Sequence, residues 1–229
     1  MNDTAPVSVI IPTLNAAKYL DVAIDSVERQ RPRPEEILVI DGGSQDGSAE
    51  IAASRHGVRV VRQAGRGLAA ARNEAIRAAS CALIAFCDAD DRWSDDALAV
   101  RLRALERHPN ASAVIGRIVL ESLEGTAATA AQVTRIGRSV PGFTPGALLI
   151  RRETFELVGA FDETLSIGAD SDWFVRLQTS PRPTLQIDAV VLYKGARNSS
   201  LSTDVGAYRR ELLTVARRFI ASRRVREPR

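Results

Sequence analysis

Cysteine, histidine and lysine are scarce in this chain of 229 residues, which holds two cysteines and two histidines. Cys81 and Cys87 lie in one predicted strand, roughly 20 Å apart at about 3.3 Å per residue. A disulfide needs Cα atoms within about 7 Å, so we expect both cysteines to be buried, free and apolar in character. His56 and His108 have no second imidazole or thiol at ligand spacing, which argues against a zinc site.

Long apolar runs and an N-terminal basic segment are also missing. No apolar run approaches the roughly 20 residues of a membrane span, and the acidic start of the chain does not resemble a secretory signal. Apolar residues make up 45% of the sequence and charged residues 26%, as in a soluble globular enzyme. We therefore expect a cytoplasmic protein with one domain spanning residues 1–229, whose core needs neither a disulfide nor a structural metal.

Positive charge is concentrated at the C-terminal end. Residues 207–229 hold eight Arg and two Glu, a local charge of +6, so the rest of the chain carries −3 of the net +3. No ribbon of aromatic and basic residues is present, and we expect no nucleic-acid partner. Two interpretations of the tail stay open: a docked C-terminal helix with a basic end, and a peripheral contact with an anionic membrane surface.

Hydrophobic periodicity divides the chain into a regular and an irregular part. In residues 1–110 short apolar runs alternate with helical patterns, which predicts βαβ units and an α/β fold with a mostly parallel sheet flanked by helices. We expect strands at 7–12, 36–41, 58–63 and 81–91, and helices at 16–30, 47–57, 68–80 and 94–110, the last with Ser94 as its N-cap.

Residues 111–206 are less regular and are expected to complete a pocket, followed by a basic helix and tail at 207–229. We expect strands at 113–122 and 185–194, a loop or irregular hairpin at 121–140, a strand and helix within 146–161, and helices at 170–178 and 208–223.

Polar or glycine-rich segments follow each of the first four predicted strands, where ligands bind in open parallel sheets. These segments contain Pro12, Thr13 and Asn15; Asp41 with two glycines; Gly67 with Arg72 a turn later; and Asp88, Ala89, Asp90 and Asp91. We expect them to line one crevice. Three carboxylates this close repel unless a cation lies among them, and oxygen ligands suit Mn²⁺ or Mg²⁺ bound to a diphosphate. For Asp91 we prefer the alternative of a residue at a helix N-terminus.

Asp41 has two readings. It can form an Asx turn or cap a helix, or it can accept a ring N–H of a nucleotide base, with the following glycines allowing close approach. Neither a Gly-x-Gly-x-x-Gly sequence after the first strand nor a Gly-Lys-Ser/Thr loop is present.

In order along residues 7–177, the segments VSVIIPTLNAAKYL, EILVIDGGSQDGS, GLAAARNEAI, LIAFCDADDRW and ADSDWFVRL resemble the inverting family 2 glycosyltransferases of the GT-A fold. The resemblance implies that Pro12, Thr13 and Asn15 lie along the nucleotide and that Asp41 binds the base. It implies donor contacts for Arg72 and for Asp88 at the ribose, a metal at Asp90, and Asp170 as general base. Gly67 and Ala89 are expected beside the donor.

Three departures from the family pattern stand out. Gly42 replaces a frequent carboxylate, Ala169 replaces a Glu beside Asp170, and the region around Lys194 and Arg197 lacks a His. Asp170 has a structural alternative as the N-cap of a short helix.

Three further residues are weaker candidates for acceptor or sugar contact. Asp172 is expected to pair with Arg176 on the surface. Trp93 and Trp173 are expected either to stack on a sugar or to pack in the core.

These observations predict an inverting glycosyltransferase. Its donor is a nucleotide-diphosphate sugar, with UDP favoured by resemblance, and its acceptor is a hydroxyl of a glycan, a lipid-linked sugar or a peptide. The alternatives are a nucleotidyltransferase, which needs a basic triphosphate loop where only Lys18 is present, and a non-catalytic relative that binds sugars or a partner.

Overall fold

The computed structural model describes residues 4–123, 128–196, 206 and 209–217. Its strands are β1 (Thr4–Thr13), β2 (Arg33–Asp41), β3 (Val58–Arg62), β4 (Leu83–Phe86), β5 (Arg92–Trp93), β6 (Ala113–Ser122), β7 (Ser139–Pro141), β8 (Leu148–Arg151) and β9 (Thr184–Ala196). Its helices are α1 (Ala17–Glu28), α2 (Ser48–Ser54), α3 (Gly67–Ala78), α4 (Ala97–Arg107), α5 (Ala130–Val133), the 3₁₀ turn η1 (Pro145–Ala147), α6 (Thr154–Val158) and α7 (Ala169–Gln178), and residues 209–217 are also helical.

The strands form one sheet in the order β3-β2-β1-β4-β8-β6-β9-β5, with β7 beside β6. Neighbours from β3 to β4 are parallel, and so are β6 and β9. The antiparallel pairings join β8 to β4 and β6, and attach the short strands β5 and β7. The expected α/β sheet is therefore confirmed, and its antiparallel part belongs to the irregular second half of the chain.

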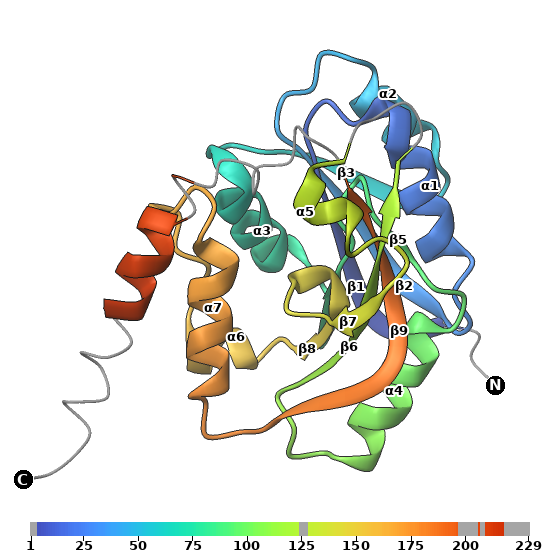
Figure 1. Cartoon of the computed structure of the whole chain (residues 1–229). Coiled ribbons are helices and arrows are strands. Elements are labelled where there is room, and N and C mark those ends of the chain that lie inside the picture. Colours follow the sequence, from blue (N-terminus) through green and yellow to red (C-terminus); the bar gives the residue numbers. More distant parts are fainter. Residues whose placement is uncertain (1–3, 124–127, 197–205, 207–208, 218–229) are drawn as a thin grey trace, which may run out of the picture.

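Helices cover both faces of this sheet, as Figure 1 shows. α1, α2 and α4 lie together on one side, whereas α3, α6 and α7 lie on the other. In α1 the residues Leu20, Ala23, Ile24 and Val27 are buried at the spacing of one helical face. β1 is buried on both faces from Val7 to Thr13, which explains its continuous apolar run.

Two local predictions need correction. Ser94 is not the N-cap of α4, because the cap is Asp96 and the Ser94 hydroxyl instead donates to the Val190 carbonyl at 2.8 Å. Cys81 and Cys87 are free and buried as expected, but both lie outside β4, which is only four residues long. The tail after residue 217 lies outside the described residues. Within the described part, no helix has the length and apolar character to cross a membrane.

Candidate functional site

Hydrogen bonds join the segments that follow β1 and β2. Asn15 has a left-handed backbone (φ 48°), and its side-chain oxygen accepts the Gln45 N–H at 2.9 Å, while its own N–H donates to the Ser44 hydroxyl at 3.0 Å. The Asp41 carboxylate accepts from the Gly43 and Ser44 N–H groups at 3.1 and 3.2 Å. Asp41 therefore forms the Asx turn that the sequence allowed, and its contact with a base stays a prediction.

The other predicted donor residues lie at the same edge of the sheet. Pro12 and Thr13 are buried at the end of β1, opposite Ile40 and Asp41 of β2. Gly67 opens α3 with φ +84°, a conformation that a side chain would strain. Ala89 is buried within the acidic segment that follows β4. The structure thus brings these segments to one edge of the sheet, and their contact with a nucleotide stays a prediction.

The acidic segment is held by cations from two other elements. Asp88 accepts from the Arg72 guanidinium of α3 at 2.9 Å and lies 3.7 Å from the Lys194 ammonium of β9. Asp91, which is 3% exposed, accepts from Lys194 Nζ at 3.2 Å and from the Gly195 N–H at 2.9 Å. Two of the three clustered carboxylates are therefore already neutralised by side chains.

Arg72 also connects this segment to α7. Its side chain is 1% exposed, and its second terminal nitrogen donates to Asp170. The guanidinium lies between the rings of Phe86 and Phe161, with centroids at 5.8 and 5.6 Å. One buried cation thus holds the carboxylates of Asp88 and Asp170, which come from opposite halves of the sequence.

The environment moves the pKa values of these carboxyls in different directions. Burial raises the pKa of Asp170 against the opposing charge of Arg72, and the charge of Asp88 raises it further. Burial also acts on Asp88, but Arg72 and Lys194 outweigh it and hold its pKa below the usual value. Burial raises the pKa of Asp91 to about 7 despite Lys194. Of the two carboxyls that Arg72 holds, Asp88 therefore stays ionised more readily and Asp170 is the stronger base.

The oxygen ligands that the protein supplies at this site fit a divalent cation only if a substrate supplies further ligands. Among the described residues, no group of three His, Cys, Asp or Glu side chains is arranged to hold a metal by itself. Asp88 and Asp91 are bound by Arg72 and Lys194, and Asp90, half-buried between them in the sequence, can contribute a carboxylate oxygen. Mg²⁺ commonly uses one or two carboxylates together with substrate phosphates, so a site of this kind fits the residues present.

Asp170 does not cap α7. The capping residue is Gly168, and Asp170 lies in the first turn of the helix. Asp172 pairs with Arg176 at 2.8 Å as predicted, but its side chain is buried, so the expectation of a surface pair was wrong.

For both tryptophans the structure shows the core-packing alternative. Trp93 and Trp173 are 1% and 0% exposed, and their ring N–H groups donate to the carbonyls of Phe86 and Gly159. Neither indole offers a face to a sugar, so the expectation of sugar contact is corrected for both residues.

Sequence reasoning overlooked the partners of two charged residues. Lys194 marked a departure from the family pattern, but nothing in the sequence connected it with Asp88 and Asp91. Glu211 received no role, yet its carboxylate accepts three backbone N–H groups directly before α7. The one signal for Lys194 was its rarity, because the chain has no lysine other than Lys18 and Lys194.

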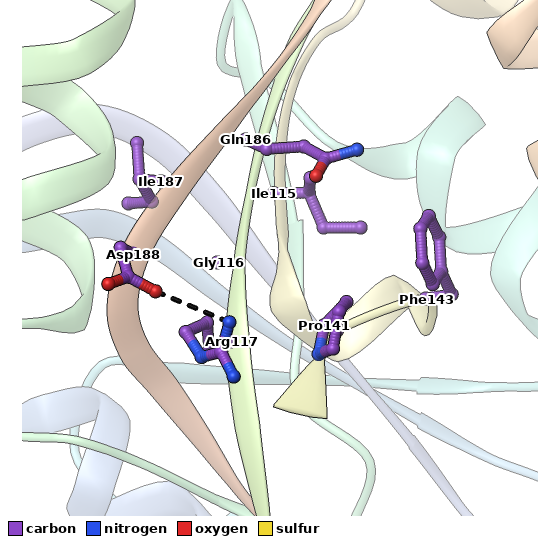
Figure 2. A pocket seen from close by; sticks show the side chains of 9 residues that line it. Ile115, Gly116, Arg117, Pro141, Phe143, Gln186, Ile187 and Asp188 are labelled. Carbon is purple, nitrogen blue, oxygen red and sulfur yellow. Dashed lines mark ion pairs between the residues drawn. The ribbon is translucent and has the colours of Figure 1, made fainter. Parts of the chain in front are cut away.

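A separate hollow of about 200 Å³ lies on β6 and β9. Figure 2 shows Ile115 and Phe143 on its wall and the ion pair of Arg117 with Asp188, at 3.3 Å. Asp188 is almost fully exposed, and the hollow shares no residue with the carboxylate site. The carboxylate site described above is therefore separate from this hollow.

Comparison with known proteins agrees with this architecture. Residues 8–161 match the family described as Glycosyl transferase family 2. A PGL/p-HBAD biosynthesis glycosyltransferase of Mycobacterium bovis is 29% identical over 182 residues, 76% of this chain and 70% of that protein.

Two solved structures share the fold. Mannosyltransferase PcManGT from Pyrobaculum calidifontis, in complex with GDP-Man and Mn²⁺, superimposes with a TM-score of 0.69 at 20% identity, covering 98% of this chain and 65% of that one. TarS of S. aureus in complex with UDP gives a TM-score of 0.65 at 18% identity, covering 90% and 65%. The chain thus spans just under two thirds of either solved protein. The expected GT-A fold is confirmed.

Proposed function

The chain belongs to glycosyl transferase family 2, and from this premise we propose that it is an inverting transferase that moves a sugar from a nucleotide-diphosphate sugar to an acceptor hydroxyl. The main support for the proposal is that Arg72 makes two ion pairs, one with Asp88 and one with Asp170. A buried cation holds an ionised carboxylate at the donor edge and a carboxyl of raised pKa at the start of α7. Carboxyls whose pKa values are pushed apart take different roles in acid–base chemistry.

Asp170 acts as the general base in this proposal. It takes the proton of the acceptor hydroxyl as that oxygen attacks the anomeric carbon from the face opposite the diphosphate. The bond between the anomeric carbon and the diphosphate oxygen breaks, and the nucleoside diphosphate leaves with the electron pair. A single displacement inverts the anomeric configuration and needs no covalent intermediate.

The donor edge binds and orients the nucleotide. We propose that Asp41 accepts from the base, that Pro12, Thr13 and Asn15 lie along the nucleoside, and that Asp88 contacts the ribose. Asp90 is proposed to hold Mn²⁺ or Mg²⁺, an ion that neutralises charge on a leaving diphosphate. UDP is the proposed nucleotide. The neighbours solved with UDP, or with GDP-Man and Mn²⁺, support a nucleotide donor and a divalent ion.

We propose an acceptor on a glycan, a lipid-linked sugar or a peptide, and a cytoplasmic location. The basic residues of 207–229 are proposed to allow peripheral contact with an anionic membrane. Arg209, Arg210 and Arg217 are exposed on the described part of that segment, so they are available to such a surface.

The direct test is a panel of nucleotide sugars, with and without manganese, assayed for release of the nucleoside diphosphate. We expect one nucleotide sugar to be turned over, with manganese increasing the rate. Release of inorganic pyrophosphate from a nucleoside triphosphate would favour a nucleotidyltransferase instead. A non-catalytic relative would be favoured if sugar nucleotides bind but are not turned over, either alone or with any acceptor sugar of a panel.

A further inference from the structure

The helix formed by residues 209–217 lies beside the start of α7 (Figure 1). From this helix the Glu211 carboxylate reaches the three backbone N–H groups that precede α7. It accepts from Ser166 at 3.1 Å, from Ile167 at 2.9 Å and from Gly168 at 2.6 Å. A single carboxylate therefore fixes three consecutive peptide units.

These contacts fix the residues that lead into α7, and one of them satisfies the N–H of the N-cap residue Gly168. The first N–H groups of a helix have no acceptor within the helix, and the N-cap residue Gly168 has no side chain to supply one. A Cβ at Gly168 would lie 3.0 Å from the Cβ of Glu211 and 3.2 Å from its carboxylate, so the glycine lets the two elements approach closely. The three N–H groups outweigh burial and lower the pKa of Glu211, which keeps it ionised. Glu211 thus fixes the backbone of the three residues that lead into α7.

Asp170 lies only two residues after Gly168. Its carboxylate is held by Arg72, and the backbone two residues before it is held by Glu211. On the C-terminal helix, Val215 is 4% exposed and anchors the helix to the core. The bond from the Gly168 N–H to Glu211 joins residues 43 positions apart. The position of Asp170 therefore depends on the helix formed by residues 209–217.

We propose that Glu211 is a positioning residue for Asp170, which makes the C-terminal helix part of the acceptor side of the site. The proposal rests on the proposed role of Asp170 as general base. Misplacing a reacting group by about 1 Å can cost about 10²-fold in rate. Loss of Glu211 should therefore reduce kcat, whereas the donor site at the ends of β1, β2 and β4 should bind as before.

The test compares Glu211→Ala, Glu211→Gln and the control Glu106→Gln, an exposed glutamate on α4. We expect Glu211→Ala to lower kcat by about 10- to 100-fold, with the Kd for the nucleoside diphosphate and the donor KM unchanged. Glu211→Gln keeps one carbonyl oxygen as acceptor and should restore part of kcat. Glu106→Gln should behave as wild type. Hydrogen exchange at residues 166–168 should be faster in Glu211→Ala.

A double-mutant cycle separates positioning from a purely structural role. If Glu211 acts through Asp170, then Glu211→Ala should cost little more in an Asp170→Asn background, because residues that act as a unit are not additive. Independent, additive losses would overturn the proposal. The proposal would also be overturned if Glu211→Gln has a normal kcat and Glu211→Ala fails to fold. Glu211 would then serve the fold alone.

Failure of this proposal is distinguishable from failure of the proposed function. If Asp170→Asn is inactive while Glu211→Ala keeps full kcat, only the positioning role is rejected. If Asp170→Asn keeps the wild-type rate, the general base itself is rejected, and the role of Glu211 falls with it.

Discussion

The two halves of the molecule hold their polar residues by different means. At the ends of β1 and β2, which are parallel neighbours, Asn15 and Asp41 bond to backbone groups of the turn that follows β2. In the second half, Asp170 and Lys194 are held by ion pairs to residues of the first half, and Glu211 holds the backbone before α7. The ends of β1 and β2 are therefore fixed by uncharged backbone donors of one adjoining turn, whereas the acceptor side depends on ion pairs and on a helix from the C-terminal part of the chain.

The largest effect is expected at the acceptor side, from Asp170→Asn. Losing a general base typically costs about 10²–10⁴ in turnover, while the Kd for the nucleoside diphosphate should stay unchanged because Arg72 keeps its ion pair with Asp88. Steady-state rates and calorimetry measure the two quantities. Glu106→Gln at an exposed position of α4 is the control, and a rate near wild type for Asp170→Asn would contradict the catalytic role.

At the donor edge, chelation is expected to remove most turnover. EDTA should lower the rate, and added Mn²⁺ or Mg²⁺ should restore it, because we propose that Asp90 and the substrate diphosphate hold the ion together. Asp90→Ala should likewise lose most of the turnover, and Asp95→Ala, an exposed neighbour, should not. Full activity of Asp90→Ala in EDTA would remove the metal from the proposal.

Breaking the connection between the halves should reduce stability. Arg72→Met leaves Asp88 and Asp170 without their common cation, and removing one partner of a buried ion pair costs about 3–5 kcal/mol. Because the two carboxylates are partly exposed, we expect the lower end of that range. Urea unfolding measures it, with Arg77→Met on the exposed face of α3 as control. If Arg72→Met and Arg77→Met unfold at the same urea concentration, the stability of the fold does not depend on the ion pairs of Arg72.

Asp41→Ala should affect the donor edge alone. We expect the Kd for the preferred nucleoside diphosphate to rise by about tenfold, which corresponds to ~1.4 kcal/mol, with the protein still folded. Isothermal calorimetry is the measurement, and Glu50→Ala on the exposed side of α2 is the control. An unchanged Kd would leave Asp41 with its Asx turn only.

The smallest effect is expected from the tail. If residues 207–229 contact lipid, the protein should sediment with anionic but not neutral vesicles at low salt, and lose that binding at high salt. Deleting residues 223–229 should weaken the binding without changing turnover on a soluble acceptor. If the whole protein stays in the supernatant with anionic vesicles, the basic segment has a structural role only.

Most of the first half was predictable from sequence because its signals are local. The alternation of apolar runs and helical patterns placed β1 to β4 and α1 to α4 within a few residues, and the rule for parallel sheets brought Asn15, Asp41 and Asp88 to one edge. The wrong N-cap at Ser94 had a non-local cause. Asp96 starts α4 because the Ser94 hydroxyl is used by β9, a strand that comes far later in the chain.

The sequence by itself determined the α/β alternation, the acidic end of β4 and the family resemblance, since each of these resides in contiguous residues. Only the tertiary structure decided that Trp93 and Trp173 are core residues and that Arg72 joins Asp88 to Asp170. It also decided that Lys194 pairs with Asp91 and that Glu211 holds the backbone before α7. Such contacts have no periodic signature, because a buried charge needs a partner in space and the chain can supply it from any distance.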